Sequence, residues 1–180
     1  MVIPPRTLET SEFLDEADKG GIVIDVRAPI EYAEDHIPGA ISWPLFSDAE
    51  RSEIGILYKK KSKEKAIEKG FEIIGPKMAE MACYGRKLFE SQTTKYPLLV
   101  HCWRGGMRSQ SVAWLLRTAS IPAIVLDGGY KAYKSHARSM YDIPLNLAIL
   151  GGLTGSAKTE VIGELRKIKG ERIVDLEGMA

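Results

Sequence analysis

Cysteine is scarce in this sequence, since only Cys83 and Cys102 occur among its 180 residues. Two cysteines are too few for a disulfide framework, and their spacing does not match that of a zinc site. We therefore predict no metal site from this pattern. The scarcity fits a reducing compartment, in which a single free thiol can be chemically reactive.

An excess of charge of one sign and long apolar runs are also absent. The chain has 25 Lys and Arg residues against 24 Asp and Glu residues, so its net charge of +1 favours neither a general nucleic-acid binder nor a membrane-surface protein. No stretch approaches the roughly 18 apolar residues of a membrane helix, and the first residues lack the apolar core of a signal peptide. We expect a globular cytoplasmic protein without a membrane partner.

Short apolar runs alternate with amphipathic segments along the chain. The expected strands are 21–26, 98–101, 123–126 and 147–150, and the expected helices are 11–18, 78–89 and 108–118. Continuous apolar runs of this length are typical of strands buried in a parallel sheet, and the apolar faces of the helices would cover that sheet. The sequence therefore predicts an α/β fold, with a parallel sheet that has helices on both faces.

Cys102 is the strongest candidate for a reactive residue. It follows the predicted strand 98–101 and precedes a helix that begins near Arg108, so it would lie at a helix N-terminus. Unpaired amides and the positive end of the helix dipole favour a thiolate there and hold an anion bound to it. The intervening glycines allow the loop to curl its amides inward, and its arginines can donate charge-assisted hydrogen bonds. We predict Cys102 as the nucleophile, with an anion-binding loop of Trp103, Arg104, Gly105, Gly106, Met107 and Arg108.

Two chemistries fit this loop. Five residues separate Cys102 from Arg108, as in cysteine-dependent tyrosine phosphatases. In a phosphatase Cys102 would attack a phosphoryl group, Arg108 would hold its oxygens, and a separate acid would protonate the leaving group. Trp43 and Pro44 resemble the start of the acid loop of that family, but Leu45 follows where the family has aspartate. The phosphatase stays an alternative hypothesis.

Three further motifs resemble those of rhodanese domains, which are sulfurtransferases that carry sulfur as a cysteine persulfide. They are residues 24–27 (Ile-Asp-Val-Arg) with Glu31 and Tyr32, residues 35–40 (Asp-His-Ile-Pro-Gly-Ala), and residues 126–130 (Leu-Asp-Gly-Gly-Tyr). The resemblance spans roughly residues 5–138 and implies a rhodanese-like fold in which Cys102 holds the sulfur.

The cysteine loop departs from that family in its length. Single-domain rhodaneses usually have four residues between the cysteine and the arginine, whereas this chain has five, so the wider ring could admit a larger anion. Asp25 and Arg27 lie at the end of a predicted strand, where we expect a buried ion pair that braces the loop.

The segment after Pro144 resembles a Walker A P-loop. Proline cannot continue a preceding helix, so we predict a linker over 141–146 that follows a domain over 1–140. Residues 147–180 are then expected to form the first part of a P-loop domain, because they are too few for a complete one. Ala157 stands where glycine is usual, and its Cβ would narrow the phosphate cradle unless the local φ is negative. A further strand is expected over 172–176. The motif implies that phosphate is bound by Gly152, Gly155, Ser156, Lys158 and Thr159. Mg²⁺ is a candidate metal for the hydroxyl of the motif.

A rhodanese-like domain followed by a P-loop is similar to the tRNA 2-selenouridine synthase family, and residues 50–59, 102–109 and 175–180 carry further resemblance. The resemblance implies a transferase that replaces sulfur by selenium in wobble 2-thiouridine of tRNA. Selenophosphate would be the selenium donor, Cys102 would carry the chalcogen, and geranyl diphosphate would supply an S-geranyl intermediate. No resident cofactor is predicted beyond these substrates.

Residues 58–69 contain six lysines, which are either a solvated helix face or contacts to the tRNA backbone. Two alternatives to the selenium transferase stay open. One is a general sulfurtransferase, or a phosphatase, with an incidental P-loop. The other is a regulatory rhodanese module without catalytic activity.

Overall fold

The computed structural model describes residues 6–144, 148–168 and 173–174. Its Cα positions divide the chain into two units, Met1–Asp142 and Ile143–Ala180. The predicted domain limits of 1–140 and 147–180 remain predictions. No helix in the described ranges combines the length and the apolar character needed to cross a membrane.

The first unit is built on a parallel sheet of five strands in the order β1-β5-β4-β2-β3. The strands are β1 (Arg6–Leu8), β2 (Val23–Asp25), β3 (Ile41–Ser42), β4 (Leu98–His101) and β5 (Ala123–Leu126). The predicted strands 98–101 and 123–126 are confirmed, and the predicted strand 21–26 is shortened to β2. The edge strands β1 and β3 were not predicted, because three and two residues are too few to show an apolar pattern.

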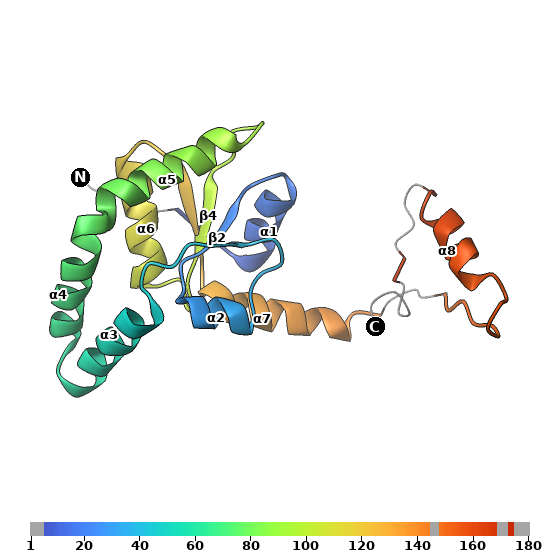
Figure 1. The fold of residues 1–180 in the computed structure, drawn as a ribbon, viewed down its shortest axis with the longest axis horizontal. Coiled ribbons are helices and arrows are strands. Elements are labelled where there is room, and N and C mark those ends of the chain that lie inside the picture. Colours follow the sequence, from blue (N-terminus) through green and yellow to red (C-terminus); the bar gives the residue numbers. More distant parts are fainter. Residues whose placement is uncertain (1–5, 145–147, 169–172, 175–180) are drawn as a thin grey trace. The chain divides into compact units, whose positions relative to one another are not determined.

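Helices cover both faces of this sheet (Figure 1). Side chains alternate between the faces along each strand. Leu98 and Val100 therefore belong to one buried cluster, which includes residues of α5 and α6, and Leu99 belongs to a second cluster, which includes residues of α1 and α7. The helices of this unit are α1 (Thr10–Asp18), α2 (Pro29–Glu34), α3 (Asp48–Lys60), α4 (Lys63–Ile74), α5 (Met78–Ser91), α6 (Met107–Thr118) and α7 (Gly129–Ser139). Short 3-10 turns occupy Gly75–Lys77 and Met140–Asp142. The predicted α/β fold is confirmed.

The lysine-rich segment forms the tip of a helical hairpin made by α3 and α4. Ser47 caps α3, because its hydroxyl accepts from the amide of Glu50 at 3.3 Å while the Glu50 carboxylate accepts from the amide of Ser47 at 2.8 Å. Ser62 caps α4 by accepting from the amide of Lys65 at 3.2 Å. The second cap starts a new helix directly after the first one ends, which places the intervening lysines at the turn.

The described part of the second unit contains one helix, α8 (Lys158–Leu165). The strand predicted over 147–150 is wrong for residues 148–150, and residues 173 and 174 of the strand predicted over 172–176 are also not in a strand. A strand needs a paired neighbour for its backbone hydrogen bonds, and none of the described residues of this unit supplies one. Residues 147, 172, 175 and 176 lie outside the described residues.

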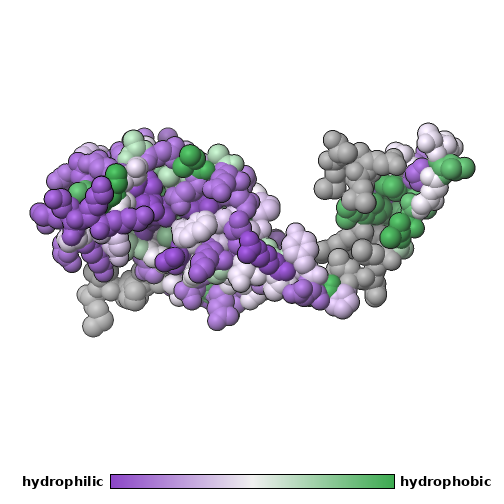
Figure 2. All heavy atoms as spheres, turned by 90° about the horizontal axis from the view of Figure 1, so that it is seen from below, coloured by the Kyte–Doolittle hydropathy of each residue, from purple (hydrophilic) through white to green (hydrophobic). Residues whose placement is uncertain are grey.

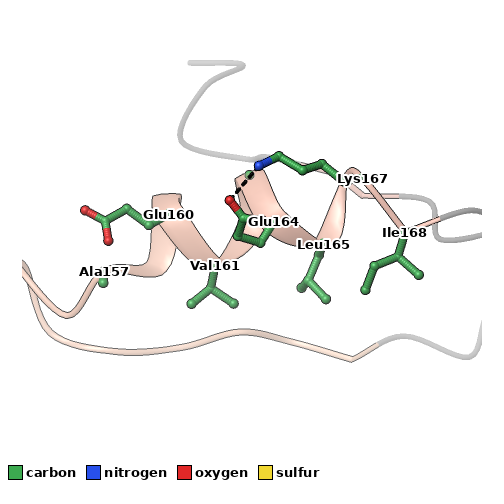
Figure 3. Close-up of a pocket in the computed structure, with 8 residues that line it drawn as sticks. Ala157, Glu160, Val161, Glu164, Leu165, Lys167 and Ile168 are labelled. Carbon is green, nitrogen blue, oxygen red and sulfur yellow. Dashed lines mark hydrogen bonds and ion pairs between the residues drawn. The ribbon is translucent and has the colours of Figure 1, made fainter.

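One side of α8 is apolar and the opposite side is charged (Figure 3). The apolar side chains are Val161 and Leu165 of α8 and Ile168 just after it, which are 43%, 38% and 53% exposed. On the charged side Lys167, in the turn after the helix, donates to Glu164 at 2.7 Å. A helix with this pattern normally buries its apolar stripe against another element.

Candidate active site

Cys102 lies directly after β4, and α6 begins five residues later at Met107. The residue is 3% exposed, and the hydroxyl of Ser109 donates to its Sγ at 3.2 Å. The twelve residues of α6 direct the positive end of their dipole at this loop. Ser109 was not among the predicted site residues, although it lies one helical turn behind the loop. The sulfur therefore lies against a hydroxyl donor at the start of this helix.

The backbone of the cysteine loop has free hydrogen-bond donors. Within the described part of the chain, the amides of Trp103, Arg104, Gly105 and Gly106 donate to no other group. Gly105 has a φ of +65°, and a Cβ at this position would meet the carbonyl oxygen of Leu126 at 2.5 Å. Glycine is therefore required where the loop turns.

The start of α7 supports the loop from behind. The amide of Tyr130 donates to the carbonyl oxygen of Cys102 at 2.8 Å, and the amide of Lys131 donates to that of Trp103 at 3.0 Å. Gly129 has a φ of +61°, and a Cβ there would collide with the Cys102 carbonyl oxygen and the Gly105 amide nitrogen. This contact explains why a Gly-Gly-Tyr sequence follows β5.

The predicted ion pair between Asp25 and Arg27 is confirmed. The two side chains are 0% and 1% exposed, and Arg27 Nη2 donates to Asp25 Oδ2 at 2.6 Å. Arg27 also donates to the carbonyl oxygen of Asp35 at 2.6 Å, and its guanidinium lies 3.9 Å from the centre of the Tyr130 ring. Because the amide of Tyr130 donates to the Cys102 carbonyl oxygen, Tyr130 connects this buried pair to the cysteine loop.

His101 is buried beside that ion pair. Neither ring nitrogen has a hydrogen-bond partner among the described residues, and Nε2 lies 3.8 Å from Asp25 Oδ2. Burial lowers the pKa of His101 from 6.5 to about 4, and the charge of Asp25 only partly opposes this effect. The imidazole is therefore neutral at pH 7 and is not a proton donor for the site.

Arg108, predicted as part of the anion-binding loop, is paired with a carboxylate. Its Nη1 donates to Glu31 Oε2 at 2.7 Å, across 77 residues of sequence. The same carboxylate oxygen accepts from the amide of Ala28 at 3.1 Å. Burial raises the pKa of Glu31, but the hydrogen bond and charge of Arg108 outweigh it, so this pKa lies below its usual value. Anion binding by Arg108 stays a prediction. The other arginine of the loop, Arg104, is exposed.

Sequence reasoning missed the role of Glu31. This residue was noted only as part of a motif, and nothing in its local sequence identifies a partner so distant along the chain.

The structure also weakens the phosphatase hypothesis. Leu45, which occupies the place of the required acid, is 4% exposed and part of the apolar core.

The predicted P-loop residues are gathered at the N-terminus of α8. Lys158 Nζ donates to the carbonyl oxygens of Gly152 and Leu153 at 2.9 and 3.0 Å, and the Ser156 hydroxyl donates to that of Leu153 at 2.7 Å. Ala157 has a φ of +59°, so the negative φ that would make this substitution harmless is not observed. Phosphate or Mg²⁺ binding by this loop stays a prediction.

Comparison with protein families matches residues 9–136 to the rhodanese-like domain. Among curated relatives, the tRNA 2-selenouridine synthase of Cupriavidus necator is 35% identical over 177 residues, covering 96% of this chain and 46% of that protein. The protein of the same name from Pseudomonas fluorescens strain Pf0-1 is 36% identical over 163 residues, covering 88% and 42%. The chain thus spans about half the length of the curated relatives it matches.

A solved structure is also similar. The N-terminal domain of a candidate ATP/GTP binding protein from Clostridium difficile 630 is 36% identical with a TM-score of 0.65, and the match covers 73% of this chain and 98% of that one.

Proposed function

Because the chain belongs to the rhodanese-like domain family, we propose that it is the chalcogen-carrying part of a tRNA 2-selenouridine synthase, with Cys102 as the carrier. The observation that carries this proposal is the buried Cys102 sulfur, which begins a loop whose amides at residues 103–106 donate to no other group in the described part of the chain. Such a site stabilises a terminal sulfide or selenide anion on the cysteine. The similarity to selenouridine synthases over nearly the whole chain supports tRNA as the acceptor.

Formation of a persulfide on Cys102 needs no added oxidant when the donor is a sulfane such as thiosulfate. The Cys102 thiolate attacks the outer sulfur, a new S–S bond forms, and sulfite leaves with the electron pair of the bond that breaks. Selenium in selenophosphate is already at the selenide level. We propose that this selenide, released with phosphate, displaces hydrogen sulfide from the Cys102 persulfide, so that an S–Se bond replaces the S–S bond.

Transfer to the RNA would follow from the terminal selenide. It attacks C2 of the 2-thiouridine, and the original sulfur leaves. An external thiol then attacks Cys102 Sγ, so that the S–Se bond breaks, the selenium stays on the tRNA and a disulfide forms between Cys102 and the thiol. Departure of the sulfur as an S-geranyl thiol would be easier than as free sulfide. In this proposal the P-loop binds the diphosphate of geranyl diphosphate.

Mass spectrometry of the intact protein tests the carrier. After incubation with thiosulfate we expect a mass gain of one sulfur atom, and after further incubation with selenophosphate the replacement of that sulfur by selenium. Cys102→Ser should abolish both adducts. Cys83→Ser removes an exposed cysteine and should leave both intact. Adduct formation by the Cys102→Ser variant would contradict the proposal.

A second candidate is a general sulfurtransferase, because the family match covers residues 9–136 and does not itself specify the acceptor. Steady transfer of sulfur from thiosulfate to cyanide, at a rate that 2-thiouridine-containing tRNA does not change, would favour this alternative. Selenouridine formed in tRNA by the full-length enzyme, and lost in its Cys102→Ser variant, would favour the first.

A further inference from the structure

The tip of the α3–α4 hairpin carries positive charge that its surroundings do not neutralise. Lys59, Lys60 and Lys61 are exposed, and none of their side chains forms a hydrogen bond or ion pair with the described residues. Farther along α4, by contrast, Lys65 pairs with Glu68 at 2.7 Å and Lys69 with Glu53 at 3.2 Å. Hydrophilic atoms cover this end of the first unit in Figure 2. The tip is therefore suited to a polyanion.

An apolar groove of about 130 Å³ lies between this hairpin and the start of α6. We call it the hairpin groove, and its lining includes Phe46, Tyr58, Phe71, Met107, Arg108 and Ser111. Tyr58, Phe71 and Met107 are 59%, 69% and 52% exposed. Large apolar side chains that gather at one exposed groove mark a binding surface.

The groove is continuous with the cysteine loop. Met107 and Arg108 line the groove and are also the last two residues of the predicted anion-binding loop. A group seated in the groove would therefore lie beside the loop that holds the reactive sulfur. Lys63, which also lines the groove, follows the three lysines of the tip and extends their charge to its edge.

We propose that the α3–α4 hairpin is the RNA-binding surface, with the tip lysines on phosphates and one unpaired base in the hairpin groove. This inference rests on the proposed function. A closed cavity of roughly 150 Å³ holds one benzene ring. The groove has about 130 Å³ and is open to solvent, so it can receive part of one pyrimidine ring while the rest stays outside. Single-stranded RNA presents phosphates and flat apolar rings next to each other, and proteins bind such bases on aromatic side chains. Tyr58 and Ser111 also line the groove and each carries a hydroxyl group.

The phosphate contacts can be tested by fluorescence anisotropy with an anticodon stem-loop that carries 2-thiouridine at the wobble position. The triple variant Lys59→Gln, Lys60→Gln, Lys61→Gln should bind at least tenfold more weakly at low salt. Its slope of log affinity against log salt should be shallower by about 2 to 3, because each lost phosphate contact removes roughly 0.7 to 0.9. The matched control is Arg6→Gln, Lys87→Gln, Arg138→Gln, which removes the same charge from exposed positions outside the hairpin. Equal losses in the two triple variants would overturn the assignment.

The base seat makes a separate prediction. Phe71→Ala should weaken binding about tenfold through lost stacking and leave the salt slope unchanged, because no phosphate contact is removed. Phe71 is largely exposed, so its replacement should not unfold the protein. Tyr141→Ala, an aromatic residue that is 89% exposed and outside the groove, serves as the control. Undiminished RNA binding by Phe71→Ala would overturn the base seat.

Loading of Cys102 with sulfur, measured on the same samples, separates this inference from the proposed function. If Cys102 is loaded normally and the hairpin variants bind RNA as well as the unmodified chain does, the proposal of an RNA-binding hairpin is wrong and the proposed function stands. Failure of the unmodified chain to bind the stem-loop would overturn both. RNA binding that responds to the hairpin variants, without any loading of Cys102, would leave the surface in place and overturn the carrier.

Discussion

At the scale of single residues, the contact between Glu31 and Arg108 determines what the cysteine loop can hold. A phosphatase needs that arginine to clamp two phosphate oxygens. Here Nη1 of the guanidinium donates to the Glu31 carboxylate at 2.7 Å, so part of this group is already engaged before an anion binds.

Glu31→Gln should release Arg108 and increase the affinity of the site for phosphate. The gain should be about tenfold, the size expected for one charge-assisted hydrogen bond that becomes available. Inhibition of thiosulfate-dependent loading of Cys102 by inorganic phosphate measures it. Glu34→Gln, at an exposed position in the same helix, should not alter the inhibition. An unchanged inhibition constant in Glu31→Gln would show that the pair does not restrict the loop.

His101 makes the stability of the first unit depend on pH. Its pKa is about 4 in the folded protein and about 6.5 when it is exposed, so the unfolded chain binds more protons between these values. Stability should therefore fall as the pH is lowered from 6.5 towards 4, by about 3 kcal/mol in total. Urea unfolding at a series of pH values measures this. His101→Asn should flatten the dependence in this range, whatever its effect on stability at pH 7.

At the scale of elements, the sequence predicts those helices and strands that have long apolar patterns. The structure agrees with the predicted α1, β4, β5, α5 and α6 to within one or two residues at most ends. The short α2 and the break between α3 and α4 were not predicted, because they depend on local caps. The strand predicted before the P-loop failed for a different reason. An apolar run becomes a strand only where another strand accepts its hydrogen bonds.

Gly129 tests how α7 supports the cysteine loop. Gly129→Ala should lower the free energy of unfolding in two ways. The left-handed backbone conformation costs about 1 to 2 kcal/mol for alanine. The collision of the new Cβ with the cysteine loop should cost roughly a further 1 to 3 kcal/mol. Loading of Cys102 should slow, because the displaced loop no longer aligns its amides. Gly39 also has a positive φ of +78°, but a Cβ there meets nothing within 4 Å. Gly39→Ala should therefore show only the first cost, with normal loading. Equal effects of the two variants on loading would contradict this account.

At the scale of the whole molecule, the candidate site combines residues that the sequence identifies with contacts that it does not. Cys102 and its glycines are recognisable because strand, loop and helix follow one another locally. The pairing of Glu31 with Arg108 and the Tyr130 ring over Arg27 join segments far apart in the chain. Such contacts follow only from how the elements pack.

The first unit should retain its chemistry without the second. Among the residues that the structure describes, both buried clusters are made of first-unit residues. The similar Clostridium difficile structure is itself an N-terminal domain. A chain of residues 1–142 should therefore unfold at the same urea concentration, within error, as the first transition of the 180-residue chain. It should also load Cys102 with sulfur at the same rate. A large loss of either property would mean that the second unit contributes to the first.

The strand order has a consequence for how long the cysteine loop keeps its shape. β5, β4 and β2 are the three inner strands, and the edges are β1 and β3. Cys102 follows β4 directly, and Arg27 lies two residues after β2. Inner strands commonly exchange their amide hydrogens only when the whole domain opens, whereas edges fray readily. Brief fraying of an edge strand would therefore leave the loop around Cys102 intact, and the amide hydrogens of β4 should exchange only at the rate of global unfolding.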